Sequence, residues 1–440
     1  MSESPKKLQI NVMFYPPGIN IDYNGQGQSE KTIQIPKLLE QPNLSALARR
    51  IYNSNKELQT QRFEKIEKIL YDIYDSQLIN YSDFQIENST NNAHIMPLLD
   101  CQFDKMGNKF VTSSYDRTAK VWDTKSADEE PVATFSGHTG AVNTCRFNVP
   151  YGSLVGTGSS DRNAAIWSVE QKKCVHMLNG HTDEVICVNF DHESKKFCSG
   201  SKDCTARVWS VETGEILNVL QKHTQKVINV EFHPQEQYLL TASKDSTAIL
   251  WDLRSNEFFA NLKFHTDKLC GAFFDTFGNR IVTGSYDKKA CVWDMKNLQK
   301  PLHVLIDHTD QIRSVSISID GKKVATASRD KTARVWSVEN GNCICICKGH
   351  SEMVRKVQFS PQGNKVVTAS DDYTCRIWDS ESGKKLDSLE DYNDIIFACS
   401  FNYAGNRIIT ASRDNTVKLW KTRNTKHCKL YEDYKKNHPI

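Results

Sequence analysis

Short runs of apolar and β-branched residues, separated by polar turns at Asp or Gly, recur along most of the chain. Two such runs span residues 365–370 and 374–378. Runs of this length that are bounded by turn-forming residues are typical of β-strands. The pattern therefore predicts a chain built mainly from short strands.

The first ninety residues follow a different pattern and carry no repeat. An apolar stretch over residues 8–15 runs into the turn-forming sequence Pro16-Pro17-Gly18, and strand-like residues resume over 19–23. Two later segments carry apolar residues at helical spacing, namely Leu44, Leu47, Ala48 and Ile51, followed by Phe63, Ile66, Leu70 and Ile73. We expect a hairpin and two helices to form a small α/β domain over residues 1–83.

The rest of the chain repeats one unit of about 42 residues eight times. All eight tryptophans recur at steps of 45, 42, 42, 42, 43, 42 and 42, as Trp122, Trp167, Trp209, Trp251, Trp293, Trp336, Trp378 and Trp420. Six residues before each tryptophan lies an aspartate: Asp116, Asp161, Asp203, Asp245, Asp287, Asp330, Asp372 and Asp414. Eight residues before lies a serine: Ser114, Ser159, Ser201, Ser243, Ser285, Ser328, Ser370 and Ser412. Further upstream the first seven units have a histidine, namely His94, His138, His181, His223, His265, His308 and His350, whereas the eighth has Tyr392.

Each unit is long enough for one four-stranded sheet, which cannot bury both of its faces alone. A ring of such sheets, or blades, buries these faces between neighbours and leaves only short edges exposed. The repeat resembles the WD40 family, whose Trp-Asp dipeptide is present at Trp122, Trp251, Trp293 and Trp378. The predicted fold is mainly β, a single eight-bladed WD40 β-propeller preceded by a small α/β N-terminal domain.

The resemblance to WD40 repeats implies a structural role for the recurring histidine, serine, aspartate and tryptophan. In that family the aspartate accepts a hydrogen bond from the histidine, whose other nitrogen meets the strand serine, and the serine reaches the indole N–H. Because each copy belongs to a different blade, the histidines and aspartates cannot converge on one metal ion or substrate. We therefore expect no catalytic, cofactor-binding or metal-binding residues, and the altered eighth unit must have a different network.

Two segments could supply the outer strand of the last blade. Residues 84–93 would join the two ends of the chain, and residues 427–433 match the spacing of the outer strand that follows Trp378. We favour the N-terminal segment. The propeller is then expected over residues 84–434, with a tail over 435–440.

Composition and charge exclude several classes of function. A net charge of +3, with 25% charged residues, argues against a general nucleic-acid binder. No apolar stretch is long enough to cross a bilayer, and the start of the chain lacks the apolar core of a secretory signal. We expect a cytoplasmic protein whose fourteen cysteines are free thiols. Alternate positions on one strand would make Cys343, Cys345 and Cys347 a poor zinc cage, so we interpret them as small buried side chains.

The resemblance to WD40 propellers implies that the residue before each turn aspartate projects at one rim, where the second strand turns into the third. These eight rim residues are Tyr115, Ser160, Lys202, Lys244, Tyr286, Arg329, Asp371 and Arg413. Aromatic and basic side chains are favoured as interface anchors. We hypothesise that an acidic peptide or protein binds Tyr115, Lys202, Lys244, Tyr286, Arg329 and Arg413. A solvated basic rim without a partner is the alternative.

Several segments outside the repeat markers resemble the dynein assembly factors with WD repeats. They are Phe14-Tyr15-Pro16-Pro17-Gly18-Ile19, Ala93-His94-Ile95-Met96-Pro97-Leu98, Asn148-Val149-Pro150-Tyr151-Gly152 and Phe401-Asn402-Tyr403-Ala404-Gly405-Asn406. The resemblance runs nearly end to end. It implies a monomeric, non-enzymatic adaptor that couples outer-arm dynein subunits to a subunit of intraflagellar transport complex B, in the cytoplasm, at the basal body and in the motile cilium or flagellum.

A second class of function remains open at this point. The segment Trp251-Asp252-Leu253-Arg254 fits the Trp-Asp-x-Arg pattern of substrate receptors for cullin-RING ubiquitin ligases. The pattern occurs once, and an arginine at this position is easily coincidental. A signalling scaffold like the G-protein β subunit is disfavoured because no N-terminal heptad pattern persists.

Overall fold

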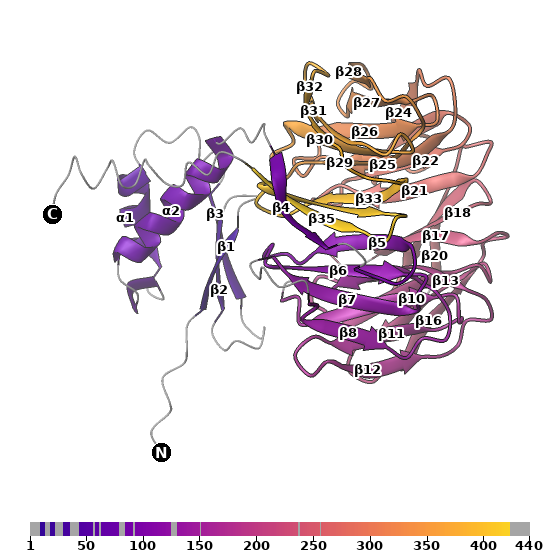
Figure 1. Cartoon of the computed structure of the whole chain (residues 1–440), viewed down its shortest axis with the longest axis horizontal. Coiled ribbons are helices and arrows are strands. Elements are labelled where there is room, and N and C mark those ends of the chain that lie inside the picture. The colour runs from indigo at the N-terminus through magenta and orange to yellow at the C-terminus, as the bar shows by residue number, and fades with distance from the viewer. Residues whose placement is uncertain are drawn as a thin grey trace. The chain divides into compact units, whose positions relative to one another are not determined.

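The computed structural model, shown in Figure 1, describes residues 9–13, 18–22, 30–35, 44–55, 58–60, 63–78, 84–90, 93–124, 130–149, 151–235, 238–255 and 257–422. Contacts divide the chain into two compact units, and the larger spans Asp83–Lys421. The alternative closing segment 427–433 and the expected tail 435–440 lie outside the described residues.

The N-terminal unit combines a small sheet with two helices. Its antiparallel sheet has the order β1 (Gln9–Met13), β2 (Gly18–Asp22), β3 (Glu30–Gln34), and its helices are α1 (Leu44–Ser54), the 3-10 turn η2 (Leu58–Thr60) and α2 (Phe63–Leu78). The predicted hairpin and helices are present. Strand β3 was not predicted, because its sequence Glu-Lys-Thr-Ile-Gln carries one apolar residue.

The predicted helical faces form the core of this unit. Leu47, Ala48 and Ile51 of α1 pack with Ile66 and Leu70 of α2 in one buried cluster. The apolar spacing therefore found the correct faces, since residues three and four apart lie on the same side of a helix. Neither of the described helices combines the length and apolar character needed to span a bilayer.

The larger unit contains eight antiparallel four-stranded sheets, as predicted. Blade 1 comprises β5 (Leu98–Phe103), β6 (Lys109–Ser114), β7 (Thr118–Asp123) and β8 (Ala133–Ser136), and blade 2 comprises β9 (Val142–Phe147), β10 (Leu154–Ser159), β11 (Ala164–Ser168) and β12 (Lys173–Leu178). Blade 3 comprises β13 (Val185–Phe190), β14 (Lys196–Ser201), β15 (Thr205–Ser210) and β16 (Ile216–Gln221), and blade 4 comprises β17 (Val227–Phe232), β18 (Tyr238–Ser243), β19 (Thr247–Asp252) and β20 (Glu257–Lys263). Blades 5 to 7 comprise β21 (Leu269–Phe274), β22 (Arg280–Ser285), β23 (Lys289–Asp294), β24 (His303–Ile306); β25 (Ile312–Ile317), β26 (Lys323–Ser328), β27 (Thr332–Ser337), β28 (Cys343–Lys348); and β29 (Val354–Phe359), β30 (Lys365–Ser370), β31 (Cys375–Asp379), β32 (Lys385–Leu389).

Blade 8 joins both ends of the propeller sequence. Its strand order is β33 (Ile396–Phe401), β34 (Arg407–Ser412), β35 (Val417–Thr422) and β4 (Phe84–Thr90), and β4 lies beside the yellow β35 in Figure 1. Residues 84–90 thus fill the position for which the sequence offered two candidates. The first strand of every blade contacts that of the next, and β33 contacts β5, so the ring closes.

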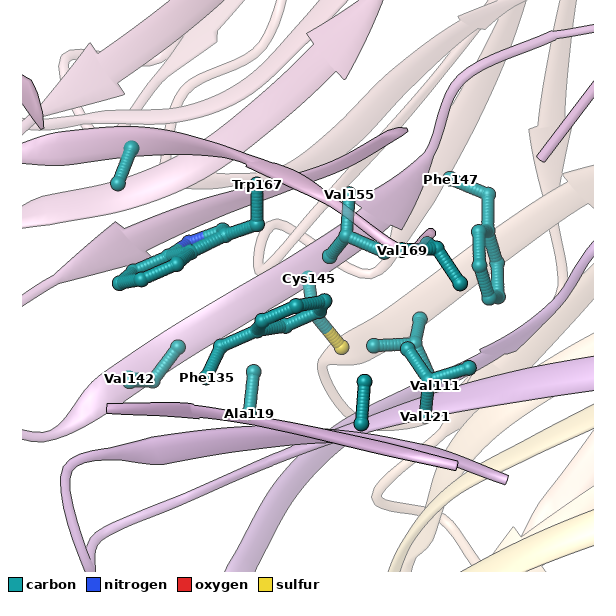
Figure 2. Close-up of a cluster of buried hydrophobic side chains, with 12 residues drawn as sticks. Val111, Ala119, Val121, Phe135, Val142, Cys145, Phe147, Val155, Trp167 and Val169 are labelled. Carbon is teal, nitrogen blue, oxygen red and sulfur yellow. The ribbon is translucent and has the colours of Figure 1, made fainter. Parts of the chain in front are cut away.

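Buried side chains between neighbouring blades form the core. Figure 2 shows one such cluster, in which Phe135 of blade 1 lies against Trp167 of blade 2, with their ring centroids 5.3 Å apart. Val121 and Val155 approach the same cluster from the two blades, and each is fully buried. Because every blade contributes both faces to such interfaces, no blade is stable alone.

Candidate protein-binding face

The turn between the second and third strands of each blade positions the turn aspartate. The residue after it has a positive φ in all eight blades, at Arg117, Arg162, Cys204, Ser246, Lys288, Lys331, Tyr373 and Asn415. Each aspartate also accepts a hydrogen bond from the backbone N–H two residues later, as Asp116 does from Thr118 at 2.9 Å. The turn geometry therefore holds the carboxylate in place independently of the histidine.

Seven blades contain the predicted pair of histidine and aspartate. The distance from the imidazole Nδ1 to the carboxylate is 2.7–2.9 Å in every pair, from His94 and Asp116 to His350 and Asp372. Burial alone would raise the pKa of Asp116, but hydrogen bonds from His94 and Thr118 outweigh burial and hold this pKa well below its usual range. Burial lowers the pKa of His94, against the influence of Asp116.

The predicted role of the serine is wrong. The imidazole Nε2 and the indole N–H both meet the hydroxyl that lies two residues earlier on the strand; in blade 1, Thr112 Oγ1 is 2.9 Å from His94 Nε2 and 2.9 Å from Trp122 Nε1. In the next six blades the equivalent hydroxyl, which meets both rings, is that of Thr157, Ser199, Thr241, Thr283, Thr326 and Thr368.

The serine stabilises the turn instead. Ser114 Oγ accepts a hydrogen bond from the N–H of Asp116 at 3.1 Å and donates one to the carbonyl of Met96 at 2.8 Å. Ser159, Ser201, Ser243, Ser285, Ser328, Ser370 and Ser412 accept the equivalent bond from their aspartates. Residues two apart on a strand share a face. The serine, nearer the turn, bonds to the turn backbone, whereas the hydroxyl two residues earlier, further from the turn, meets the indole N–H.

The sequence contained the missing signal. A threonine or serine stands ten residues before all eight tryptophans, with Thr410 in the last unit. The serine at minus eight was equally regular, and spacing alone does not say which hydroxyl lies beside the indole.

The eighth blade has the altered network that its sequence predicted. Tyr392 replaces the histidine, and its hydroxyl contacts Thr410 Oγ1. Trp420 Nε1 donates to both hydroxyls, at 3.0 Å from Tyr392 and 3.1 Å from Thr410. The carboxylate of Asp414 accepts hydrogen bonds from Asn393 and Thr416 instead of a histidine. A tyrosine thus satisfies the buried indole without a charged partner.

All eight rim residues lie on one face of the ring. The backbone N–H of each donates to a carbonyl of the loop that leads into the first strand of its own blade, as Tyr115 does to Pro97 and Lys244 to Lys226. The same bond is made by Ser160, Lys202, Tyr286, Arg329, Asp371 and Arg413. We call this side of the propeller, formed by the turns and those loops, the loop face.

The charges of the rim residues are unevenly neutralised. Lys202 pairs with Glu184 at 2.6 Å, and Arg329 and Arg413 lie 3.8 Å from Asp310 and Asp394. Tyr115 is 48% exposed. The ammonium of Lys244 instead lies 4.0 Å from the centre of the Tyr286 ring. The rim is therefore less uniformly basic than its sequence suggested.

The loop face also holds charged residues that the sequence reasoning missed. Arg313 contacts the same ring as Lys244, with its guanidinium carbon 4.8 Å from the Tyr286 ring centre. Arg355 binds the carboxylate of Asp371 and lies 5.3 Å from the Phe397 ring centre. Both arginines occupy the second position of the first strand in their blade, so a comparison of that position between repeats would have revealed them.

The first strands line a cavity of about 260 Å³ in the propeller. Its wall includes the ion pair of Asp100 and Arg146, together with Glu231 and Lys356. Glu231 accepts a hydrogen bond from the N–H of Phe274 in the next blade at 3.0 Å. Burial raises the pKa of Glu231 to about 8, so this carboxyl is largely protonated at neutral pH.

Metal-binding geometry is absent from the described part of the chain. No group of three His, Cys, Asp or Glu residues there is arranged to hold a metal ion. The described cysteines are free thiols, and Cys345 and Cys347 are buried, while Cys343 is partly exposed.

Comparisons with known proteins agree with this geometry. The chain matches the family model for the WD domain, G-beta repeat, eight times, at residues 87–123, 129–168, 172–210, 214–252, 256–294, 299–337, 341–379 and 383–421. The crystal structure of the computationally designed Ika8 protein matches with a TM-score of 0.66 and 24% identity, over 74% of this chain and 97% of that one. That likeness concerns the fold alone.

Natural relatives give a more specific similarity. The chain is 37% identical to dynein assembly factor with WD repeat domains 1 from Homo sapiens over 190 residues, which are 43% of this chain and 45% of the relative. The Danio rerio protein of that name is 37% identical over 42% of this chain and 45% of its own length. The expected resemblance to this family is confirmed, but its expected extent of nearly the whole chain is not, because the matched part spans less than half of either chain. With its eight matched repeats and closed ring of eight blades, the chain belongs to the WD40 repeat family.

Proposed function

We propose that this protein is a non-catalytic adaptor in the assembly of axonemal dynein. The observation that carries the proposal is its 37% identity to dynein assembly factors over 190 residues. In the finer form of the proposal, it links outer-arm dynein subunits to a subunit of intraflagellar transport complex B. It then works as a monomer in the cytoplasm, at the basal body and in the motile cilium or flagellum, without binding nucleic acid or inserting into a membrane.

Binding through the loop face is supported by the roles of the polar residues. The recurring histidines, aspartates and hydroxyls bond to one another within their own blades, as His308, Asp330 and Thr326 do. The exposed side chains of the loop face are left to contact partners, and tyrosine and arginine are favoured at interface centres. We propose an acidic partner segment that contacts Tyr115, Lys202, Lys244, Tyr286, Arg329 and Arg413.

Affinity purification from ciliated cells tests the adaptor role. Tagged full-length protein should recover dynein heavy and intermediate chains and intraflagellar transport subunits, measured by quantitative mass spectrometry against the tag alone. A variant with Lys202, Lys244, Arg329 and Arg413 all changed to Glu should recover fewer of them. Unchanged recovery of every partner would remove the rim from the proposal, and absence of dynein subunits from the wild-type sample would remove the adaptor role.

One observation supports the alternative function as a substrate receptor of a ubiquitin ligase. The side chain of Arg254 is 69% exposed, and its Nε lies 3.7 Å from Asp252, so the guanidinium is accessible to a partner. Recovery of a ligase linker protein by the wild-type chain, and its loss in an Arg254→Ala variant, would favour this function over dynein assembly.

A further inference from the structure

Three positive side chains come from different blades of the propeller: Lys244 and Arg313 contact the ring of Tyr286, and Lys356 lines the cavity. Burial raises the pKa of the Cys270 thiol to about 12, and all three charges act to lower it. Lys244 comes from the turn of blade 4, Arg313 from β25 of blade 6 and Lys356 from β29 of blade 7. Blade 5 supplies Cys270 itself.

Tyr286 of blade 5 organises two of these charges. The ammonium of Lys244 and the guanidinium of Arg313 lie 4.0 Å and 4.8 Å from the centre of its ring. Cation–π contacts of this kind hold a long side chain in place without neutralising its charge. We call Lys244, Tyr286, Arg313 and Lys356 the cationic sector.

Carboxylates lie beside several other basic residues of the loop face. Lys202 has Glu184, Arg413 has Asp394, and Arg355 has Asp371. No ion pair within the described ranges involves the ammonium of Lys244 or Lys356, or the guanidinium of Arg313. The cationic sector thus keeps three uncompensated positive charges.

The cavity wall does not supply the missing negative charge. Asp100, which lines the same cavity as Lys356, is already paired with Arg146. Glu231 is largely protonated at neutral pH, since burial raises its pKa to about 8. Neither of these two carboxyl groups therefore neutralises the charge of Lys356.

We propose that the cationic sector binds the phosphate group of a phosphoserine or phosphothreonine on a protruding segment of a partner protein. A carboxylate carries one negative charge and two oxygens, whereas a phosphate monoester carries nearly two charges and three acceptor oxygens. Three cations in one part of the ring match the phosphate better. The inference rests on the proposed function as a protein adaptor, and it adds that phosphorylation of the partner controls binding.

Binding of peptide libraries to the full-length protein tests the inference. The probes are fluorescein-labelled peptides with a fixed phosphothreonine between randomised residues, and matched libraries with Thr or Glu at that position. Fluorescence anisotropy should show at least about tenfold tighter binding of the phosphothreonine library than of the Glu library. Inorganic pyrophosphate should compete with it.

Matched variants locate the site. The double variant Lys244→Glu, Arg313→Glu and the single variant Lys356→Glu should each weaken phosphopeptide binding by about tenfold or more, with thermal unfolding as the check on folding. The control Lys331→Glu reverses a charge that already lies beside an acidic partner, Glu352, and it should retain binding.

Three results would overturn the inference. They are equal affinity for the phosphothreonine and Glu libraries, binding that survives in the double variant, and equal losses in the sector and control variants. If wild-type protein recovers dynein subunits from cells while the phosphopeptides do not bind, the phosphate site fails and the adaptor role stands. If the phosphopeptides bind but no dynein subunit is recovered, the adaptor role fails instead.

Discussion

At the scale of single residues, the buried hydroxyl of Thr326 lies between two rings that each need it. Trp336 Nε1 donates to Thr326 Oγ1 at 2.9 Å, and His308 Nε2 lies 2.7 Å from the same oxygen. The carboxylate of Asp330 can only accept, so Nδ1 of the imidazole carries a proton, and in the neutral imidazole Nε2 accepts the proton of Thr326. The aspartate thus fixes the tautomer of the neutral histidine, and one threonine serves both rings.

Thr326→Val should destabilise the protein by about 1–3 kcal/mol, because it leaves the indole N–H and the imidazole Nε2 without partners while keeping the side-chain volume. Chemical denaturation measures the change. Thr213→Val, at an exposed threonine in the turn before β16, is the matched control and should change stability by less than about 0.5 kcal/mol. Equal effects of the two substitutions would contradict the corrected network.

The burial of Glu231 leads to a second prediction at this scale. Gln102 and Gln358 occupy the equivalent position in blades 1 and 7, and they accept the same hydrogen bond from the next blade, from Phe147 and Phe401 at 3.2 Å and 3.1 Å. A neutral amide therefore suffices for the contact that Glu231 makes with Phe274. The carboxyl of Glu231 differs from these amides in that it can gain or lose a proton.

In the wild type, the pKa of Glu231 is about 8 in the folded state and near 4.5 in the unfolded chain. The folded state holds the proton of Glu231 more tightly than the unfolded chain does. The stabilisation that this tighter proton binding gives is complete below pH 4.5 and is lost as the pH rises through 8. Glu231→Gln should remove at least about 1 kcal/mol of the loss in stability between pH 5 and pH 8.5. Denaturation curves at several pH values measure this difference, and parallel pH profiles for both proteins would refute it.

At the scale of elements, strand β4 holds the ring closed. Phe84 is buried and packs edge-on against Phe401, with ring centroids 6.4 Å apart. Glu87 binds the guanidinium of Arg407 through both carboxylate oxygens, at 2.6 Å and 2.9 Å. The hydrogen bonds from Arg407 and Lys421 outweigh the effect of burial and lower the pKa of Glu87, so the pair stays charged.

Phe84→Ala should cost about 3 kcal/mol, because it empties an interior position where the first and last parts of the propeller meet. Amide hydrogen exchange should show that β35 loses protection before the strands of blade 4 do, since the substitution acts where β4 joins blade 8. Phe259→Ala, on the outer strand β20 where the ring is 49% exposed, is the control and should cost less than about 1 kcal/mol. A uniform loss of protection around the ring would contradict a local closure at blade 8.

At the scale of the whole molecule, the repeated pairs of histidine and aspartate give the propeller a common sensitivity to acid. Hydrogen bonds and the histidine charge outweigh burial at each of seven turns and lower the pKa of Asp116, Asp161, Asp203, Asp245, Asp287, Asp330 and Asp372. An aspartate with a lowered folded-state pKa stabilises the protein above its unfolded pKa, near 4, and loses this contribution as the pH falls.

The free energy of unfolding should therefore fall steeply between pH 5 and pH 3, with an uptake of several protons per molecule on unfolding, obtained from the slope of stability against pH. Asp287→Asn should reduce this uptake by about one proton, since it removes one of the seven carboxylates. A stability profile that is flat down to pH 3 would contradict the prediction.

The sequence by itself determined the number and kind of blades. One tryptophan every 42 to 45 residues, with an aspartate six residues before it, marks local turns and strands whose geometry depends on neighbouring residues. Apolar residues at helical spacing likewise revealed both helical faces of the N-terminal unit, such as Ile66 and Leu70. These features are readable because they repeat or are periodic over a few residues.

Only the tertiary structure decided which hydroxyl meets each indole, which segment closes blade 8 and which rim charges are neutralised. Lys202 has Glu184 beside it, whereas Lys244 stacks on Tyr286, the ring that Arg313 also contacts. Such contacts join residues from different strands or blades, so they depend on strand register and ring closure. The physical reason is that a side chain's charge environment is set by its neighbours in space, which a one-dimensional repeat does not specify.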